Sequence, residues 1–433
     1  MGGLGIRLNE LSQESPKSMM EVWGRPFIYY QIELMKRHGL KNFIFCIGYK
    51  AEKIKNYFLD GRKFGIKIEY SFDGKSLLGT GGAVIKALPL LGDDFIVIYG
   101  DSYMDVDYSE LIYQYNAVKR NGGKKGLMAV FNNRNKFDLS NVIFKNGKLI
   151  RYNKKNATKG CRFIDYGISM LNRDVLSVFP KNKFIDLADI YNILVKKKLM
   201  AGYEVYNRFY EIGSPASLRE FKDFIYKRLF VKKPAVMLDR DGTINELCFN
   251  ENTQQLDSPL EPEELRLLPK VIYALKVIKS LGYLIIVVSN QPAAAKGKAS
   301  LSNLYSVNNR LREILLKKRA AIDEFLFCPH HPVGSPLCRE RFLIKDCRCR
   351  KPKAGLLRGA IKKLNISIKD SFMAGDSYTD IIAGEKAGLK TVFLGIYKCD
   401  TCRLLKRVRP KFIFNNLADF ALFLKNKNED KEI

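Results

Sequence analysis

Short apolar runs alternate with segments of helical periodicity along the whole chain. The apolar runs have the length of buried strands and include residues 42–47, 67–72, 95–99, 235–238, 284–288, 325–327, 371–374 and 391–394. Segments with apolar residues at helical spacing lie between them and include residues 26–37, 83–91, 271–281, 301–319 and 356–364. This alternation predicts an α/β fold with parallel-type sheets that are covered by helices on both faces.

A change in pattern near residue 230 divides the chain. A charged segment of helical periodicity, residues 218–229, ends there, and Val231-Lys-Lys-Pro leads into a new apolar strand. At 433 residues the chain is long enough for more than one hydrophobic core. We therefore expect two Rossmann-like domains, residues 1–230 and 231–433.

The net charge of +29 first suggests a polyanionic partner. The excess is shared almost equally, +15 in residues 1–230 and +14 in residues 231–433, and neither half has a basic tail. This distribution favours a solvated lysine-rich surface with sites for anionic small molecules, and we expect no nucleic-acid partner. No apolar run is long enough to span a bilayer, and no apolar signal region follows Met1. We expect a cytoplasmic protein that does not insert into membranes.

The nine cysteines do not suggest a secreted disulfide framework, because their number is odd and four of them crowd into one segment. That segment holds Cys328, Cys338, Cys347 and Cys349, together with His330 and His331. Such a cluster in a reducing compartment indicates a metal site; the alternative is a set of free thiols beside a surface histidine. Cys399 and Cys402 lie apart from any second pair, and we expect them to be free thiols.

The first chemical signal of the second half follows the strand at 235–238 directly. Asp239 and Asp241 flank an arginine, and Gly242 and Thr243 come next. Two carboxylates at the carboxyl end of a parallel strand lie where open α/β sheets bind ligands. Gly242 permits a turn, and we expect the Thr243 hydroxyl to steady the loop by hydrogen bonding.

Three further signals follow later strands in order. Ser289 and Asn290 end the strand at 284–288, Arg350 and Lys351 supply cations, and Asp376 with Asp380 follows the strand at 371–374. A hydroxyl and an amide suit a phosphoryl oxygen, a cation offsets the charge of a phosphoryl group, and carboxylates suit a divalent cation.

With these four motifs the second half resembles the haloacid-dehalogenase (HAD) superfamily of phosphatases. The resemblance implies that Asp239 is a nucleophile that becomes an aspartyl phosphate, and that Asp241 is the general acid and base. It implies a phosphate-binding and substrate-binding set of Thr243, Ser289, Asn290, Arg350 and Lys351. It also implies Mg²⁺ held by Asp239, Asp376 and the backbone carbonyl of Asp241.

Within that superfamily the sequence is most similar to the branch of heptose-bisphosphate and histidinol-phosphate phosphatases. The similarity lies in Cys328-Pro-His330-His331-Pro and in the later Cys347-Arg-Cys349-Arg-Lys-Pro. Cys328, His330, Cys347 and Cys349 form a Cys₃His set that satisfies tetrahedral Zn²⁺ and leaves no open position. We expect a structural zinc loop whose far end delivers Arg350 and Lys351 to the phosphate.

The first half resembles the sugar-1-phosphate nucleotidyltransferases. The matching segments are Met1-Gly-Gly-Leu-Gly-Ile-Arg7, Ser15-Pro-Lys17, and residues 78–83, 99–102, 164–167 and 209–215. The resemblance implies nucleotide binding by Gly2, Gly3, Gly5, Arg7, Lys17 and Gly79, and a second Mg²⁺ held by Asp101 and Glu211. The family's apolar first strand is not in this sequence. We expect a start upstream of Met1, a gap between the strands around Phe43 and Phe95, and weak transfer without the added strand.

The two resemblances fit one reaction sequence. Removal of the 7-phosphate from D-glycero-D-manno-heptose 1,7-bisphosphate gives heptose 1-phosphate, to which the first half would transfer a nucleotidyl group. GTP is the expected donor, with ATP and CTP as alternatives. The product would supply a surface polysaccharide such as lipopolysaccharide. Three alternatives remain open: a histidinol-phosphate phosphatase, a polynucleotide 3′-phosphatase, and a phosphatase tuned by a non-catalytic regulatory first half.

Overall fold

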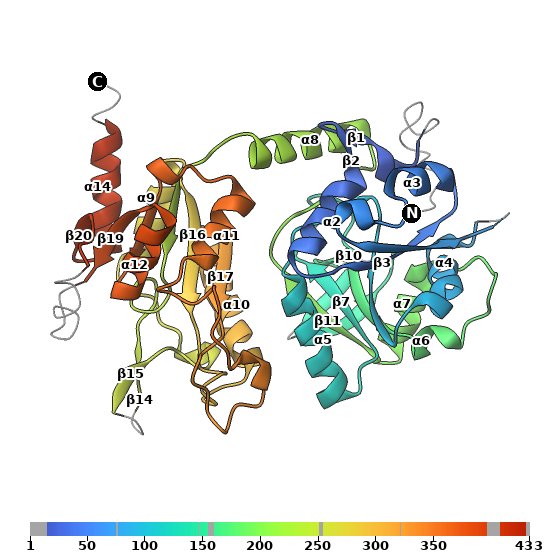
Figure 1. The fold of residues 1–433 in the computed structure, drawn as a ribbon. Coiled ribbons are helices and arrows are strands. Elements are labelled where there is room, and N and C mark those ends of the chain that lie inside the picture. The colour runs from blue at the N-terminus through green and yellow to red at the C-terminus, as the bar shows by residue number, and fades with distance from the viewer. Residues whose placement is uncertain are drawn as a thin grey trace. The chain divides into compact units, whose positions relative to one another are not determined.

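A computed structural model describes residues 15–74, 77–145, 147–154, 160–250, 254–320, 322–395 and 408–429. The chain forms two compact units, Met1–Ile225 and Tyr226–Ile433 (Figure 1). Gly2, Gly3, Gly5 and Arg7 lie outside the described residues, as do Cys399 and Cys402.

The second unit is built on a six-stranded sheet in which every neighbouring pair is parallel. Its strands, in spatial order, are β17 (Glu324–Cys328), β16 (Leu284–Asn290), β13 (Ala235–Leu238), β18 (Phe372–Gly375), β19 (Lys390–Leu394) and β20 (Phe412–Phe414). Because these strands are parallel, the carboxyl ends of β17, β16, β13 and β18 lie at one edge of the sheet, where ligands bind in open α/β folds.

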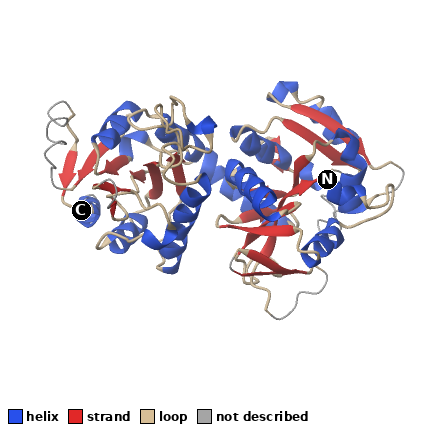
Figure 2. Cartoon of the chain, turned by 90° about the horizontal axis from the view of Figure 1, so that it is seen from below, coloured by secondary structure: helices blue, strands red, loops and turns tan. Residues whose placement is uncertain are grey.

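Helices cover both faces of this sheet, as the chain's alternation predicts (Figure 2). Alternate residues of β13 enter opposite cores: Val236 and Leu238 pack with α9 (Val271–Ser280), α10 (Leu301–Lys317) and α14 (Leu417–Glu429). Ala235 and Met237 pack with α11 (Gly355–Leu364) and α12 (Tyr378–Ala387). Burial on both faces explains why these strands are continuous apolar runs.

A short antiparallel hairpin, β14 (Cys248–Asn250) and β15 (Gln255–Asp257), follows the Asp239–Asp241 loop. It pairs with no strand of the large sheet among the described residues. Phe249 and Leu256 lie directly opposite each other on it, and both are exposed. The hairpin is therefore a separate element beside the edge that carries Asp239.

The first unit contains a mixed four-stranded sheet in the order β11 (Met200–Val205), β7 (Gly126–Phe131), β10 (Ile164–Asn172) and β5 (Asp94–Ile98). β11 and β7 are parallel, whereas β10 runs antiparallel to both of its neighbours. The smaller pairs are β1 (Glu21–Val22) with β2 (Arg25–Pro26), parallel β3 (Asn42–Ile47) with β4 (Lys67–Phe72), β6 (Ser102–Met104) with β12 (Phe209–Glu211), and β8 (Val142–Lys145) with β9 (Lys148–Tyr152). The expected α/β class is confirmed, with antiparallel strands added in this unit.

The helices of the first unit are α2 (Phe27–Arg37), α3 (Ala51–Phe58), α4 (Gly79–Ala87), α5 (Tyr108–Gly122), α6 (Asp174–Ser177), α7 (Leu187–Lys196) and α8 (Pro215–Leu229), which crosses into the second unit. The helix expected over residues 83–91 begins earlier, at Gly79, and ends at Ala87. Gly79 adopts φ +71°, and a Cβ there would lie 2.6 Å from the carbonyl oxygen of Ile185. The glycines therefore allow this helix to start against the segment before α7.

A cavity of about 1130 Å³ lies between β3 and β5 and is lined by Phe43 and Phe95 from those strands. Within the described part of the chain, β3 pairs only with β4, and β5 pairs only with β10. Gln31 of α2 lines the cavity, is fully buried, and leaves its Oε1 without a partner among the described residues. The cavity lies between the strands around Phe43 and Phe95, where a gap is expected from the sequence, and the missing strand itself stays a prediction.

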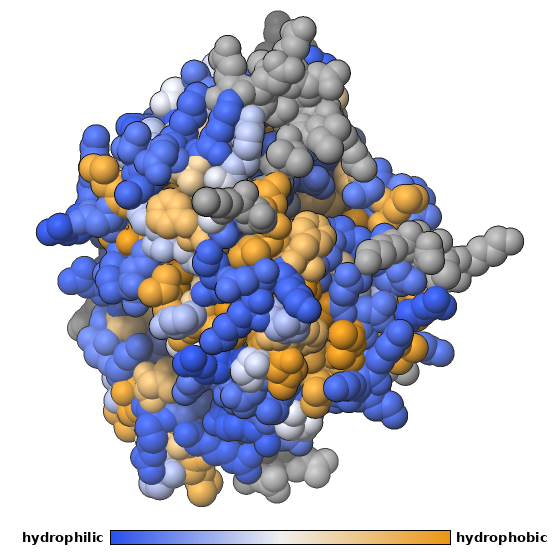
Figure 3. Space-filling view, turned by 90° about the vertical axis from the view of Figure 1, so that its right-hand side faces the viewer, coloured by the Kyte–Doolittle hydropathy of each residue, from blue (hydrophilic) through white to orange (hydrophobic). Residues whose placement is uncertain are grey.

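The face drawn in Figure 3 is mostly hydrophilic, with apolar residues gathered in patches among the polar ones. Such a surface agrees with a chain in which 27% of the residues are charged. None of the described helices combines the length and the apolar character needed to cross a bilayer.

Candidate active sites and metal centre

Lys351 joins the motifs of the second unit at the carboxyl edge of the sheet. Its Nζ lies 2.8 Å from Oδ1 of Asp239, which follows β13, and 2.5 Å from Oδ1 of Asp380 on α12. The same Nζ donates a hydrogen bond to the carbonyl oxygen of Val288 in β16, at 2.7 Å. Two strands and one helix thus place polar groups around one ammonium group.

The side chain of Lys351 is almost completely buried, and a buried ammonium group is stable only when it is paired. Burial alone would lower the pKa of Lys351, but the carboxylates of Asp239 and Asp380 raise it above its ordinary value. Lys351 therefore stays charged at neutral pH. A fixed cation beside Asp239 offsets the repulsion between this carboxylate and a phosphoryl group.

Asn290 holds the backbone of Lys351. Its Nδ2 donates to the carbonyl oxygen of Lys351 at 2.9 Å, and its Oδ1 accepts from the amide nitrogen of Lys351 at 3.0 Å. Both polar atoms of the Asn290 side chain are used in this way. Asn290 thus holds the backbone of Lys351, and its expected contact with a phosphoryl group stays a prediction.

Asp239, Asp376 and Asp380 offer carboxylate oxygens within 4.8 Å of one another. Burial, and after it the charges of Asp239 and Asp380, raise the pKa of Asp376 from 3.8 to about 8. A Cβ on Gly242 would lie 2.1 Å from Oδ2 of Asp376, so only glycine allows the first loop to approach this carboxylate. Crowded buried carboxylates with a shared open side suit a hard divalent cation, and the donor set fits Mg²⁺.

Two hydroxyls at the same edge have no hydrogen-bond partner among the described residues: Ser289 Oγ and Thr243 Oγ1, both buried. Thr243 does not steady its loop as expected. Backbone hydrogen bonds do so instead, from Ile244 N to Arg240 O and from Gly242 N to Asn245 O, each at 2.8 Å. Buried hydroxyls without partners are costly, and the oxygens of a bound phosphoryl group would satisfy them.

The carboxylate of Asp241 is held by four hydrogen bonds. Arg240 donates from Nε to Oδ1 and from its terminal nitrogen to Oδ2, each at 2.9 Å. Asn245 Nδ2 donates to Oδ1 at 2.9 Å, and Ser258 Oγ donates to Oδ2 at 3.0 Å. Arg240 was given no role from the sequence, although it lies between the two carboxylates of the first motif, and Ser258 was not singled out, because a lone serine carries no recognisable motif.

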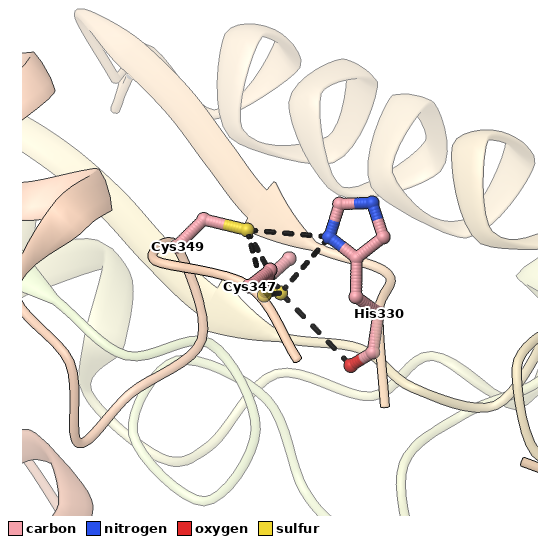
Figure 4. A group of neighbouring side chains, drawn as sticks. His330, Cys347 and Cys349 are labelled. Atoms are coloured by element: carbon pink, nitrogen blue, oxygen red, sulfur yellow. Dashed lines mark hydrogen bonds between the residues drawn. The ribbon is translucent and has the colours of Figure 1, made fainter. Parts of the chain in front are cut away.

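The four predicted zinc ligands come together at the end of β17 and on the loop that follows (Figure 4). Cys349 Sγ lies 3.2 Å from Cys328 Sγ, 3.1 Å from Cys347 Sγ and 3.2 Å from His330 Nδ1. A tetrahedral zinc with bonds of about 2.0–2.3 Å separates its ligand atoms by about 3.6–3.8 Å, so small shifts would fit the ion.

The electrostatics of this group also suit a cation. Hydrogen bonds from the thiols of Cys328 and Cys347 lower the pKa of Cys349 to about 5. Arg350 follows directly and donates to the carbonyl oxygen of His330 at 3.3 Å. The cluster therefore ties both ends of the loop together next to Lys351. Cys338 is buried elsewhere, and His331 contacts Val333.

The first unit brings Asp101 and Glu211 together through the β6–β12 pair, in which Glu211 lies opposite Ser102. The amide of Ile212 donates to the carbonyl oxygen of Asp101 at 3.0 Å. Burial, followed by the charges of Asp101 and Asp138, raises the pKa of Glu211. Lys17 Nζ lies 4.0 Å from Oδ2 of Asp101. Two acids and a cation converge as the sequence predicts, and their roles remain predictions.

Lys154 is a cation of this site that the sequence analysis missed. Its Nζ lies 5.3 Å from the centre of the Tyr99 ring, and its charge opposes the rise in the pKa of Glu211. A lysine after β9 carries no signal of its own in a lysine-rich chain. Gly79, expected to bind nucleotide, packs against Ile185, which explains this glycine without a ligand.

Comparison with known proteins relates each half of the chain to a known family. The nucleotidyl transferase family model matches residues 1–228, and the HAD-hydrolase-like model matches residues 348–420. The second half is 37% identical over 163 residues to D-glycero-alpha-D-manno-heptose-1,7-bisphosphate 7-phosphatase of Photorhabdus laumondii, covering 38% of this chain and 82% of that protein.

The first half is 30% identical over 221 residues to D-glycero-alpha-D-manno-heptose 1-phosphate guanylyltransferase of Campylobacter jejuni, covering 51% of this chain and 95% of that protein. A crystal structure of D,D-heptose 1,7-bisphosphate phosphatase from B. bronchiseptica, complexed with magnesium and phosphate, aligns with a TM-score of 0.37 at 22% identity. The alignment covers 45% of this chain and 99% of the chain in that crystal structure. The chain is an enzyme that belongs to the nucleotidyl transferase family and, through its second half, to the HAD-type phosphatases.

The raised pKa of Asp376 predicts a stability that depends on pH. The folded state binds this proton more tightly than the unfolded state, so metal-free stability falls as pH rises from about 4 to about 8. We expect Asp376→Asn to raise the metal-free thermal midpoint at pH 8 by about 4 °C or more, with little effect near pH 4. Mg²⁺ should stabilise the wild type at pH 8 but not the variant.

Thermal unfolding in EDTA and in Mg²⁺ across this pH range checks the prediction. Asp346→Asn is the matched control, because Asp346 is an exposed acid paired with Lys353 and should leave the pH dependence unchanged. If Asp376→Asn showed the same pH dependence of stability as the wild type, the raised pKa of Asp376 would be contradicted.

Proposed function

We propose that the chain catalyses two consecutive steps of heptose activation. The second half removes the 7-phosphate of D-glycero-D-manno-heptose 1,7-bisphosphate, and the first half transfers GMP from GTP to the resulting heptose 1-phosphate. One relative of each half supports this pairing: the Photorhabdus laumondii phosphatase is named for the alpha bisphosphate and the Campylobacter jejuni guanylyltransferase for the alpha 1-phosphate. Other relatives of the second half, such as that of Pasteurella multocida, are named for the beta bisphosphate.

The observation that carries the phosphatase proposal is the buried contact between Lys351 and Asp239. A paired lysine makes Asp239 approachable for an anionic substrate, while Ser289 and Thr243 offer free buried hydroxyls. These are the elements that nucleophilic phosphoryl transfer to a carboxylate requires. A merely structural ion pair would not explain the two buried hydroxyls without partners.

The reaction then follows from the positions of two carboxylates. A carboxylate oxygen of Asp239 attacks phosphorus, and the bond between phosphorus and the sugar oxygen breaks. The leaving sugar oxygen takes a proton from Asp241. Water next attacks the aspartyl phosphate, gives its proton to Asp241, and releases inorganic phosphate and the free carboxylate of Asp239.

Two metals complete the proposal. Asp239, Asp376 and the backbone carbonyl of Asp241 would hold Mg²⁺, which when bound neutralises charge on the phosphoryl oxygens. Cys328, His330, Cys347 and Cys349 would hold Zn²⁺, a closed structural site with no open position. Thiolate ligands and a nucleoside triphosphate substrate both suit the reducing cytoplasm.

In the first half, Asp101 and Glu211 would hold a second Mg²⁺ between nucleotide and sugar phosphate. A phosphate oxygen of heptose 1-phosphate would attack the α-phosphorus of GTP, and pyrophosphate would leave. Lys17 and Lys154 are placed to offset negative charge near these acids. The work of the protein here is positioning and charge neutralisation.

Asp239→Asn tests the phosphatase. The amide keeps the shape of the side chain but cannot form an acyl phosphate, so phosphate release from the heptose bisphosphate should fall about 10³-fold or more. Asp60→Asn, at an exposed acid of the first unit paired with Arg62, is the control and should retain activity. Hydrolysis by Asp239→Asn near the wild-type rate would exclude the mechanism. If the wild type hydrolysed histidinol phosphate or a polynucleotide 3′-phosphate faster than the heptose bisphosphate, that compound would be the substrate instead.

Elemental analysis tests the zinc. Protein purified without chelator should contain about one zinc per chain, because three thiolates and one imidazole fill its coordination. Cys347→Ser should lose the metal, lower the thermal midpoint and reduce phosphate release, since the loop bearing Lys351 loosens. Cys338→Ser changes a cysteine of the same loop outside the set and should keep its zinc. Zinc-free wild-type protein would contradict the site.

Asp101→Ala tests the transferase. It should lower pyrophosphate release from GTP and heptose 1-phosphate about 10²-fold or more while phosphate release stays unchanged. Asp93→Ala, at an exposed acid, is the control. Because of the gap between β3 and β5, the assay uses both this chain and a version preceded by about six apolar strand-forming residues. No transfer by either version with any nucleotide would favour a regulatory first half.

A further inference from the structure

We propose that Arg240 is a positioning residue that fixes the carboxylate of Asp241, and that the Ser258 hydroxyl occupies the place that the leaving-group oxygen takes. This inference rests on the proposed phosphatase function. It concerns two residues to which neither the motifs nor the comparisons assign a role.

The carboxylate of Asp241 has no free acceptor position in this structure. An ionised carboxylate offers about four lone-pair sites, and Asp241 accepts two hydrogen bonds from Arg240, one from Asn245 and one from Ser258. A substrate oxygen can therefore contact Asp241 only after one of these donors leaves. The structure shows the conformation before that exchange.

Arg240 is the donor least able to leave. Its side chain is fully buried, and its remaining terminal nitrogen donates to Asn308 Oδ1 at 2.6 Å. Asn308 and Gln291 exchange two side-chain hydrogen bonds of 3.0 Å each. The backbone N–H of Gln291 donates to the carbonyl oxygen of Cys328. If Asp241 left Arg240, a guanidinium charge would remain unpaired inside the protein, which is strongly unfavourable.

Asn245 is also fully buried and is fixed by a second bond, from Nδ2 to the carbonyl oxygen of Glu246 at 2.8 Å. Ser258 differs from both. It is neutral and only partly buried, and it directly follows β15 of the separate hairpin. Exchange of a neutral hydroxyl for a substrate oxygen leaves no charge unpaired. Ser258 is therefore the donor that the substrate replaces.

The exchange gives each residue a distinct effect on the reaction. When Ser258 leaves, the freed Oδ2 of Asp241 can bind a proton from water. In the first step the phosphorus–oxygen bond to the sugar breaks, and that proton moves from Oδ2 of Asp241 to the sugar oxygen. Arg240 keeps the Asp241 carboxylate in place for this transfer but contacts no reacting atom. Loss of Arg240 should therefore slow the reaction of a poor leaving group, which needs a proton, more than that of p-nitrophenolate, which does not.

Steady-state kinetics on the full chain with heptose 1,7-bisphosphate and p-nitrophenyl phosphate test the proposal. Arg240→Met should lower kcat about 10²-fold for the bisphosphate and less than about tenfold for p-nitrophenyl phosphate. Arg240→Lys keeps the charge without the paired donors and should fall between the wild type and Arg240→Met. Ser258→Ala opens a position on Asp241 and should leave kcat/KM for the bisphosphate equal or raise it by up to about tenfold.

Equal losses for both substrates in Arg240→Met would show a merely structural role and overturn the assignment of Arg240. Ser258 lies on a partly exposed segment, so its variant should fold even if Arg240→Met does not, and thermal unfolding checks this. A loss of more than about tenfold in Ser258→Ala would overturn the proposal on its own. A wild type that hydrolyses neither substrate would instead refute the proposed function.

Discussion

The second half of the chain depends on the burial of one ammonium group. Lys351 is enclosed by the carboxylates of Asp239 and Asp380 and by the carbonyl oxygen of Val288. Removing one partner from a buried ion pair costs about 3–5 kcal/mol, because the other charge is left uncompensated. The partners come from the ends of β13 and β16 and from the start of α12. The site therefore forms only when these strands have reached their parallel register. The ion pair between Lys351 and Asp239, which places a cation beside the proposed nucleophile, thus depends on correct folding of the sheet.

Lys351 reaches this position from a loop with little regular structure, and two attachments fix that loop. The Asn290 amide holds both backbone polar groups of Lys351. The group of Cys328, His330, Cys347 and Cys349 joins the beginning of the loop to its end. Ordering a long loop has a large cost in conformational entropy, and a closed metal centre is one way to offset it. The metal would thus act on catalysis only through the position of Lys351.

The sequence predicted what depends on local pattern. Continuous apolar runs located β13, β16 and β18 because both faces of their sheet are buried, and motifs directly after these runs located Asp239, Ser289 and Asp376. Contacts between distant residues leave no such pattern. The hold of Arg240 on Asp241 depends on Asn308, and the role of Asn290 depends on a backbone 61 residues away. The strands β7 and β10 were missed because their apolar residues do not stand out in a chain that is 46% hydrophobic.

The two halves use charge in different ways, and burial explains the difference. In the second half the cation and its carboxylates are shielded from water before substrate arrives, so their fields are strong and fixed. In the first half Lys17 and Asp101 keep 20% and 34% of their side-chain surface exposed and lie 4.0 Å apart. Water weakens such a pair, and only a bound nucleotide and metal would exclude that water and draw the groups together. The surroundings of Lys351 are therefore organised by the fold itself, whereas the pair of Lys17 and Asp101 would become shielded only with ligands bound.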